Sequence, residues 1–261
     1  MGTPWDAAAP LYLEEWVPRI LPYHLDLVRE VALLPGSRVF VPSAGPGSEV
    51  LAAGRVVGAN GFVRATDKSE AMVHLCREQV ARAALPARIE CHVGDAASAE
   101  GGPWDAVLCA FGLWQLGSRC DAMRAWAAEL APEGRVGVIT WGPREPGSPF
   151  DRLRTSLEEI APDRAVPDPF VQAEREPMAA MFAEAGLTMV RHTVVRHTLS
   201  FPTTAAFVMA MREGCSWRRI GEELGAVTFE RVAVRFCESF GGPLAPLAFD
   251  PPATLAIGVR P

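Results

Sequence analysis

Two glycines, Gly45 and Gly47, and two aspartates, Asp67 and Asp95, are the residues whose types and spacing best suit ligand binding. The run from Arg38 to Val50, RVFVPSAGPGSEV, predicts a buried strand, a glycine turn and then a helix. Glycine lets a backbone turn tightly and approach a ligand, and the following helix points free N–H groups at that ligand. The stretch therefore indicates the start of a nucleotide-like site, although an isolated Gly-x-Gly favours a structural turn.

The glycine turn does not fit the dinucleotide fingerprint. That fingerprint is Gly-x-Gly-x-x-Gly, and its third glycine position is occupied here by Val50. A pyrophosphate-binding loop is therefore not expected.

Asp67 ends the second predicted strand, 20 residues after Gly47. An aspartate there can accept both hydroxyls of a ribose, or it can be the N-cap of the helix that DKSE begins. Asp95 ends the third predicted strand in VGDAAS. Its carboxylate can accept from an amino group such as that of adenine, or it can simply belong to the turn.

Strands and helices alternate between residues 36 and 142, which predicts a parallel, doubly wound sheet. The strands are expected over 36–42, 61–67, 87–95, 103–112 and 132–142, and the helices over 48–58, 68–84 and 118–130, with Ser48 as an N-cap and Gly58 as a stop. Ligands bind such sheets at the carboxyl ends of the strands. Because the glycine turn, Asp67 and Asp95 all come at strand ends, we expect them to converge on one site.

The two flanking regions read differently. Residues 1–35 predict amphipathic helices that Pro18 and Pro22 break into short pieces. Residues 150–220 predict two or three helices, of which 178–187 is the clearest, a strand over 189–201 lies between them, and a strand over 253–261 closes the chain. The candidate linkers, 146–149 and 162–169, are short. We therefore expect one domain made of a helical lid (1–35), a ligand-binding core (36–145) and a helical insertion with closing strands (146–261).

Composition excludes several classes of protein. A formal net charge of −6 over 261 residues argues against a nucleic-acid-binding surface. The six cysteines form no Cys-x-x-Cys pair, so neither a metal site nor a disulfide framework is predicted. No apolar run reaches the roughly 18 residues that would span a membrane, and no signal peptide is seen. A cytoplasmic protein, monomeric or homodimeric, is expected.

The run from Arg38 to Gly142 resembles the class I S-adenosylmethionine-dependent methyltransferases, closest to the branch of the ubiquinone and menaquinone C-methyltransferases. The matching segments are RVFVPSAGPGSEV, GFVRATDKSEAMV, CHVGDAAS, WDAVLCAFGLWQL, LAPEGRVGVITWG and PREPGSPF, and WDAAAPLYLEEW is similar to the lid helix of that branch. The resemblance implies an α/β Rossmann-like fold, with a doubly wound, mostly parallel seven-stranded sheet, an N-terminal helical lid and a C-terminal helical insertion.

The resemblance also implies roles for residues. S-adenosylmethionine, and its product S-adenosylhomocysteine, would be bound by Ser43, Gly45, Gly47, Asp67, Lys68, Met72, Asp95, Ala96 and Phe111. The substrate would be bound by Tyr12, Trp16, Trp114 and Gln115.

One part of the glycine turn departs from the family pattern. Val41 falls at the acidic position that ends the first strand, and Ser43 falls at the first glycine. The missing carboxylate usually holds the amino group of the methionine part, so its loss can weaken binding of the cofactor about 10-fold or more. Glu49 is close by, but we interpret it as complementing the helix dipole rather than as a replacement.

A base is needed only if the nucleophile carries a proton at the working pH. His24 in the lid and His197 in the predicted strand 189–201 are the candidate bases, although ordinary hydrogen-bonded histidines are the plainer interpretation. His74 is expected on the surface, and His92, inside a central strand, is expected in the core.

The resemblance implies an enzyme that transfers a methyl group from S-adenosylmethionine to a small molecule by in-line displacement, in bacterial specialised metabolism. The aromatic residues of the lid suit a flat or apolar, natural-product-like substrate, although they can equally serve to pack the lid. The altered turn motivates an alternative: a methyltransferase-fold protein that binds the cofactor weakly or not at all and acts as a cyclase, an isomerase or a binding protein.

Overall fold

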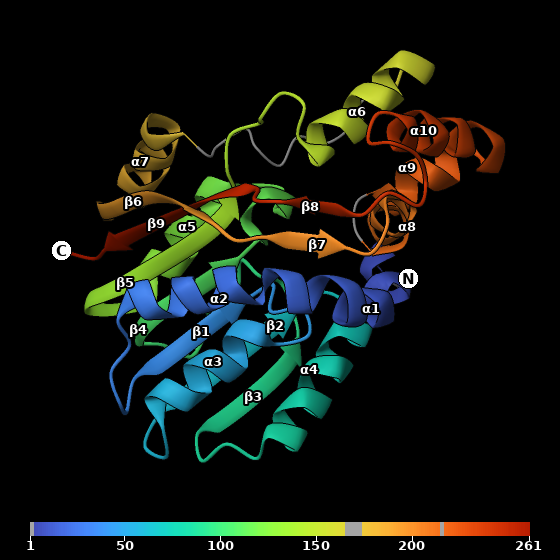
Figure 1. Ribbon diagram of the computed structural model, residues 1–261. Coiled ribbons are helices and arrows are strands. Elements are labelled where there is room, and N and C mark those ends of the chain that lie inside the picture. Colours follow the sequence, from blue (N-terminus) through green and yellow to red (C-terminus); the bar gives the residue numbers. More distant parts are fainter. Residues whose placement is uncertain (1–2, 165–173, 215–216) are drawn as a thin grey trace.

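A seven-stranded sheet forms the centre of the molecule in the computed structural model, which describes residues 3–164, 174–214 and 217–261 (Figure 1). The strand order is β3-β2-β1-β4-β5-β9-β6. The strands are β1 (Arg38–Pro42), β2 (Phe62–Asp67), β3 (Arg88–Val93), β4 (Trp104–Ala110), β5 (Leu130–Trp141), β6 (Thr188–Arg196) and β9 (Pro252–Val259). Strand β9 runs antiparallel to both neighbours, and the pairs from β3 to β5 are parallel. The predicted doubly wound, mostly parallel sheet is confirmed.

Helices cover both faces of this sheet. Helices α2 (Val17–Val31), α3 (Ser48–Val57) and α4 (Glu70–Ala83) share one core with the sheet, and α5 (Arg119–Ala128) and α7 (Arg175–Glu184) share the other. Successive side chains of β1 enter opposite cores: Val39 and Val41 face α2 and α3, and Phe40 packs with Trp104. A strand buried on both faces needs a continuous apolar run, which explains the sequence RVFVP.

The N-terminal segment is less broken than the sequence predicts. Helix α1 (Pro4–Leu11) passes through a π-helical turn, η1 (Tyr12–Trp16), directly into α2. Pro18 lies in the first turn of α2, where its missing N–H costs little, and Pro22 lies inside the helix. The predicted division into short pieces is wrong, because α2 buries an apolar face that includes Ile20 and Leu27 and this burial outweighs one lost hydrogen bond.

The C-terminal half adds a helical group beyond the sheet (Figure 1). It contains α6 (Pro149–Ile160), α8 (Thr204–Gly214), α9 (Trp217–Leu224) and α10 (Ala226–Glu238), and a small sheet of β7 (Leu199–Phe201) and β8 (Leu247–Phe249). The strand predicted over 189–201 is divided between β6 and β7, which belong to different sheets, and α10 and β8 were not predicted. Most of the candidate linker 162–169 lies outside the described residues.

Helix α2 can approach the sheet closely because β5 has a glycine beneath it. A Cβ atom added at Gly137 would lie 2.3 Å from Cγ2 of Val31 and 3.0 Å from Cδ1 of Leu27. We therefore expect Gly137→Ala to lower the free energy of unfolding by about 1–3 kcal/mol, as overpacked cores do, measured by urea denaturation. Gly117→Ala is the matched control, because no atom lies within 4 Å of its added Cβ. Equal stabilities of the two variants would contradict this packing.

Candidate functional site

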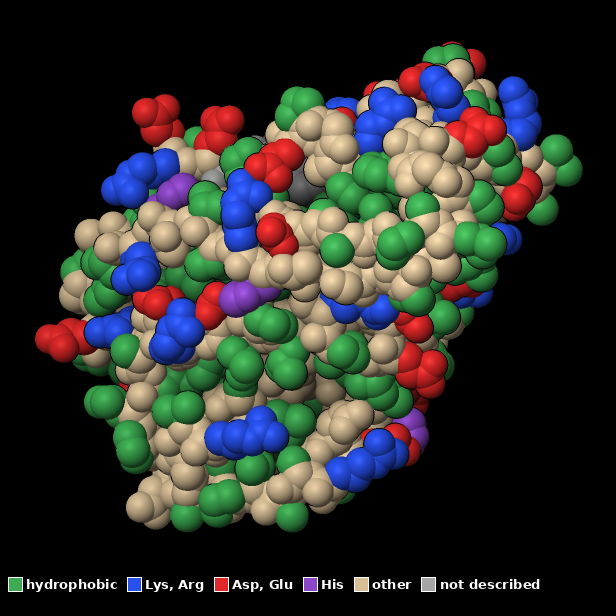
Figure 2. Space-filling model, viewed as in Figure 1, with side chains coloured by type: hydrophobic (Ala, Val, Ile, Leu, Met, Phe, Trp, Pro, Cys, Tyr) green, Lys and Arg blue, Asp and Glu red, His purple; other side chains and the backbone are tan. Residues whose placement is uncertain are grey.

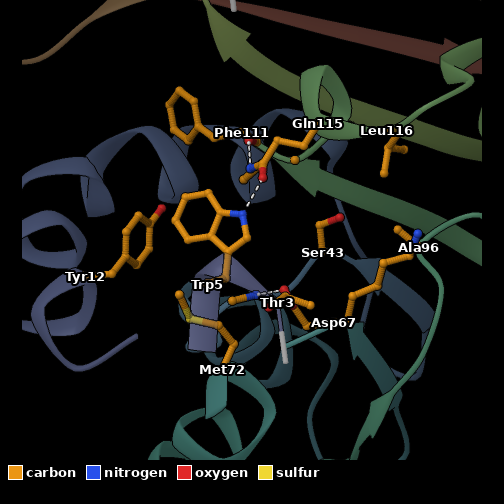
Figure 3. A pocket seen from close by; sticks show the side chains of 14 residues that line it. Thr3, Trp5, Tyr12, Ser43, Asp67, Met72, Ala96, Phe111, Gln115 and Leu116 are labelled. Atoms are coloured by element: carbon orange, nitrogen blue, oxygen red, sulfur yellow. Dashed lines mark hydrogen bonds between the residues drawn. The ribbon is translucent and has the colours of Figure 1, made fainter. Parts of the chain in front are cut away.

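A cavity of about 230 Å³ lies at the carboxyl ends of β1, β2 and β4 (Figure 3). Its lining includes many of the residues that the resemblance assigns to cofactor and substrate: Ser43, Gly45, Asp67, Lys68, Met72, Ala96, Phe111, Tyr12 and Gln115. The lining also includes Trp5, one of the aromatic residues of the lid, and residues that sequence reasoning did not assign: Thr3, Ala110, Gly112 and Leu116. The strand ends thus meet at one cavity.

The glycine turn after β1 has left-handed backbone at Ser43 (φ 53°), Gly45 (φ 50°) and Gly47 (φ 93°). Gly47 does not line the cavity but is the N-cap of α3, so the prediction of Ser48 as the N-cap is wrong. A Cβ atom at Gly47 would lie 2.6 Å from Sγ of Cys76. Gly47 is therefore required by backbone conformation and by the close approach of α4.

A second left-handed residue lies in the neighbouring turn, after β4. Phe111 follows β4 with φ 53°, and a Cβ atom on the next residue, Gly112, would lie 2.6 Å from Cβ of Ser43. The turns after β1 and β4 therefore touch. Left-handed backbone at residues other than glycine is strained and concentrates at functional sites, which supports a functional role for this edge of the sheet.

Asp67 braces the glycine turn. Its Oδ2 accepts a hydrogen bond from the N–H of Gly45 (2.9 Å), and its Oδ1 accepts one from the N–H of Ser69 (2.9 Å). Burial raises the pKa of Asp67, and the charges of Glu49 and Asp6 add to the rise. The N-cap of α4 is Ser69, whose Oγ accepts from the N–H of Met72 (3.2 Å), so the interpretation of Asp67 as that N-cap is wrong.

Asp95 lies outside the lining of the cavity and is exposed. Its Oδ1 accepts from the N–H of Ala97 (3.0 Å), as expected for a turn residue, and its Oδ2 is 3.2 Å from Nζ of Lys68. Lys68 is the only lysine among the 261 residues. Lys68, a cation that lines the cavity, is therefore already paired with a carboxylate.

The N-terminal helix reaches into the cavity through Trp5 (Figure 3). The Nε1–H of Trp5 donates to Oε1 of Gln115 (2.7 Å), and its ring packs edge-on against Tyr12 (5.6 Å between centroids). At the base of the same helix, Oδ1 of Asp6 accepts from the hydroxyl of Ser69 (2.6 Å) and from the N–H of Ala71 (3.2 Å). The lid is thus fastened to the start of α4.

The two other aromatic residues assigned to the substrate do not line the cavity. Trp16 is buried in the core, where its Nε1–H donates to the carbonyl of Ala210 (2.9 Å) and its ring stacks on Phe150. Trp114 lies in the short helix η2 (Leu113–Gln115) but is not part of the lining. The structure places Trp16 in lid packing.

The candidate bases occupy two different hydrogen-bonded pairs. His24 is buried, with Nδ1 at 2.8 Å from Oε2 of Glu49, and its ring is 5.7 Å from that of Phe111. Glu49 lies in the first turn of α3, where it can complement the helix dipole as interpreted, but it is only 1% exposed and is also the buried partner of His24. The signal available in the sequence was a carboxylate inside the apolar helix SEVLAAGRVV.

His197 lies away from the lining of the cavity. Its Nε2 is 2.6 Å from Oδ2 of Asp26, and its backbone N–H donates to the hydroxyl of Tyr23 (2.9 Å). The hydroxyl of Tyr23 in turn donates to the carbonyl of Pro251 (2.6 Å), and burial raises its pKa to about 12. This group of polar contacts joins α2 to the C-terminal strands.

The predictions for His74 and His92 have different outcomes. His74 is exposed on α4, as predicted. The prediction of His92 as a core residue is wrong: β3 is the edge strand of the sheet, and the His92 side chain is 50% exposed. Periodicity cannot distinguish an edge strand from a central one, because strand order is decided by tertiary pairing.

Two absences hold for the part of the chain that the structure describes. No group of three or more histidine, cysteine, aspartate or glutamate side chains is arranged to hold a metal ion. None of the helices there has the length and hydropathy needed to cross a bilayer.

The contacts of Asp6 give a test of the lid. Hydrogen bonds, first of all from Ser69, lower the pKa of Asp6, so the stabilisation that it contributes is present above the unfolded-state pKa and is lost only as the pH falls through the lowered value. We expect Asp6→Ala to speed amide hydrogen exchange in α1 by about 10-fold at neutral pH. The exposed lid residue Glu14 provides the control, Glu14→Ala. Unchanged exchange in Asp6→Ala would show that the lid is held by other contacts.

Comparisons with known proteins agree with this geometry. Residues 43–134 match a family model described as a methyltransferase domain. The chain is similar to the YcgJ protein of Bacillus subtilis (17% identity, TM-score 0.58, covering 92% of this chain and 98% of that chain). It is also similar to a putative methyltransferase of Bacillus halodurans C-125 (13% identity, TM-score 0.62, covering 91% and 98%).

A third similar structure is the [4+2]-cyclase SpnF (18% identity, TM-score 0.59, covering 95% of this chain and 83% of that chain). No curated protein matches the chain in sequence. With the seven-stranded sheet and the match over residues 43–134, these similarities show that the chain has the Rossmann-like methyltransferase fold.

Proposed function

We propose that the protein transfers a methyl group from S-adenosylmethionine to a small, apolar or aromatic molecule. The observation that carries the proposal is the convergence of Ser43, Gly45, Asp67 and Phe111, from three strand ends, on one cavity. The match of residues 43–134 to a methyltransferase domain supports it. We also propose that the protein belongs to the branch of the ubiquinone and menaquinone C-methyltransferases.

The residues present suit this cofactor. Each oxygen of Asp67 accepts one backbone N–H, and a carboxylate oxygen has a further acceptor position, so Asp67 can also accept ribose hydroxyls. Met72 and Ala96 offer apolar surface for the adenine, and the ring of Phe111 offers a face to a cation.

The cavity is too small for both ligands in this arrangement of the lid. About 230 Å³ is less than the roughly 300–1,000 Å³ of sites for drug-sized ligands, and Trp5 projects into the space (Figure 3). We infer that the N-terminal helix, joined to α2 by a π-helical turn, shifts to admit ligand and then covers it. A covering Trp5 would exclude water from the reacting atoms.

When bound, the cofactor supplies a methyl group activated on a sulfonium. The chain then has to hold a nucleophile in line with that methyl group and keep water out, because alignment supplies much of the rate. Phe111, held by the rings of Tyr23 (5.9 Å) and Trp141 (4.5 Å), forms a rigid wall for this purpose. If the nucleophile carries a proton, His24 is the better candidate base, because its ring lies 5.7 Å from that of Phe111, which lines the cavity, whereas His197 lies away from the lining.

A function without methyl transfer is the second candidate. The same fold occurs in the [4+2]-cyclase SpnF. The last residues of β1 include the buried, apolar Val41, which contributes no carboxylate to the cavity. On this alternative the cavity would bind a substrate for cyclisation or isomerisation, and the cofactor weakly or not at all.

Calorimetric titration of the purified protein with S-adenosylmethionine and S-adenosylhomocysteine tests the proposal, after any co-purified ligand has been removed. We expect micromolar binding, and protection of Lys68 from acetylation in mass spectrometry, since that lysine lines the cavity. If folded, ligand-free protein binds neither compound, the proposal is wrong and the second candidate function is favoured. If the cofactor binds, assays of methyl transfer to a panel of small aromatic compounds would identify the substrate class.

Asp67 gives a sharper prediction. We expect Asp67→Asn to weaken the binding of S-adenosylmethionine by 10-fold or more, because hydrogen bonds to a charged group contribute about 1.5–3 kcal/mol. Asp121→Asn, an exposed aspartate on α5, should have no effect. Since burial raises the pKa of Asp67 and only the ionised carboxylate accepts two hydroxyls, wild-type affinity should fall with decreasing pH. That fall should begin above the usual titration range of aspartate.

A further inference from the structure

A buried carboxylate lies close to the cavity but outside its lining. Glu49, in the first turn of α3, is 1% exposed, and its Oε2 is 2.8 Å from Nδ1 of His24. A carboxylate this deeply buried is costly unless it is paired or used. The question is whether His24 neutralises it.

The hydrogen bonds of His24 answer this question. Nε2 of His24 is buried and has no hydrogen-bond partner among the residues that the structure describes. A doubly protonated ring would place a charged N–H there without an acceptor, whereas a neutral ring places only a lone pair there. The favoured arrangement is a neutral His24 that donates its Nδ1–H to Glu49, so the carboxylate keeps its negative charge.

Glu49 is close enough to the cavity for this charge to act on a ligand. Its charge contributes to the raised pKa of Asp67, which lines the cavity, and to that of Cys109 on β4, although burial is the larger cause for both. On the other side, the His24 ring packs 5.7 Å from the ring of Phe111, which also lines the cavity. The pair therefore lies close to two residues that line the cavity, Asp67 and Phe111.

The other charges around the cavity do not cancel Glu49. Asp67 and Asp6 are also carboxylates, and the charge of each of Asp6 and Glu49 raises the pKa of Asp67. The cation in the lining, Lys68, is 3.2 Å from Asp95. In a site of low effective dielectric, unpaired negative charge favours a ligand with net positive charge.

We propose that Glu49, oriented by His24, is a specificity-determining residue that makes the cavity prefer a cationic ligand over its neutral counterpart. This rests on the proposed function: S-adenosylmethionine carries a net charge of about +1 at neutral pH, because its sulfonium adds to a zwitterion, and S-adenosylhomocysteine carries about zero. Methyl transfer would thus remove the charge that Glu49 attracts, so that the product is released more readily than the reactant.

Titration of wild-type protein and Glu49→Gln with both compounds tests this. Glutamine keeps the size of the side chain, and its Oε1 can still accept a hydrogen bond from His24. The substitution therefore removes the charge and changes little else in the packing. We expect S-adenosylmethionine to bind Glu49→Gln about 10-fold more weakly, with S-adenosylhomocysteine nearly unchanged. Glu176→Gln is the matched control: Glu176 is also in the first turn of a helix, but it is exposed, on α7 at the opposite face of the sheet.

The outcomes separate the two proposals. If the wild type binds neither compound, the proposed function fails and this inference fails with it. If both compounds bind but Glu49→Gln weakens both equally, or neither, Glu49 does not select by charge and only this inference is overturned.

A second measurement does not depend on the folding of a variant. Sinefungin replaces the sulfonium with an amine and keeps the positive charge, so the wild type should bind it more tightly than S-adenosylhomocysteine. Binding of sinefungin no tighter than that of the neutral product would overturn the inference even if Glu49→Gln failed to fold.

Discussion

The paired hydrogen bonds of Asp67 are the interaction on which the candidate site depends. One carboxylate joins the glycine turn after β1, through Gly45, to the start of α4 after β2, through Ser69. The hydroxyl of Ser69 then donates to Asp6 of the lid. Three segments far apart in the chain are therefore held by one short network, and the charge that holds them is costly to bury, which the raised pKa of Asp67 reflects.

A second constraint is the contact between the turns after β1 and β4. Ser43 and Phe111 both have left-handed backbone, and the absence of a side chain at Gly112 allows their turns to touch. Packing of Tyr23 and Trp141 holds Phe111 in this conformation. The strain is thus supported by the aromatic core behind it, and it shapes the edge of the sheet where the cavity forms.

The N-terminal helices connect these constraints to the rest of the molecule. Helix α2 contributes His24 to the pair with Glu49 and Tyr23 to the contacts with the C-terminal strands. Helix α1, which precedes it, brings Trp5 into the cavity and Asp6 to the start of α4. The same continuous segment therefore both packs on one face of the sheet and contributes Trp5 to the cavity.

The sequence by itself determined the alternating parallel core and the residues at its strand ends, because apolar runs, glycines and aspartates are local signals read in chain order. Gly45 and Asp67 could be predicted in this way, and the resemblance to methyltransferases added Ser43, Met72, Ala96 and Phe111.

Only the tertiary structure decided which of these residues share the cavity. Strand order places His92 on the edge strand β3. Burial of an apolar face allows Pro22 to lie inside α2. Asp95 pairs with Lys68 instead of lining the cavity. The pairing of Glu49 with His24 joins segments 25 residues apart. No local pattern encodes such a pair, because its energy comes from the shared burial of two polar groups and exists only once α2 and α3 have packed together.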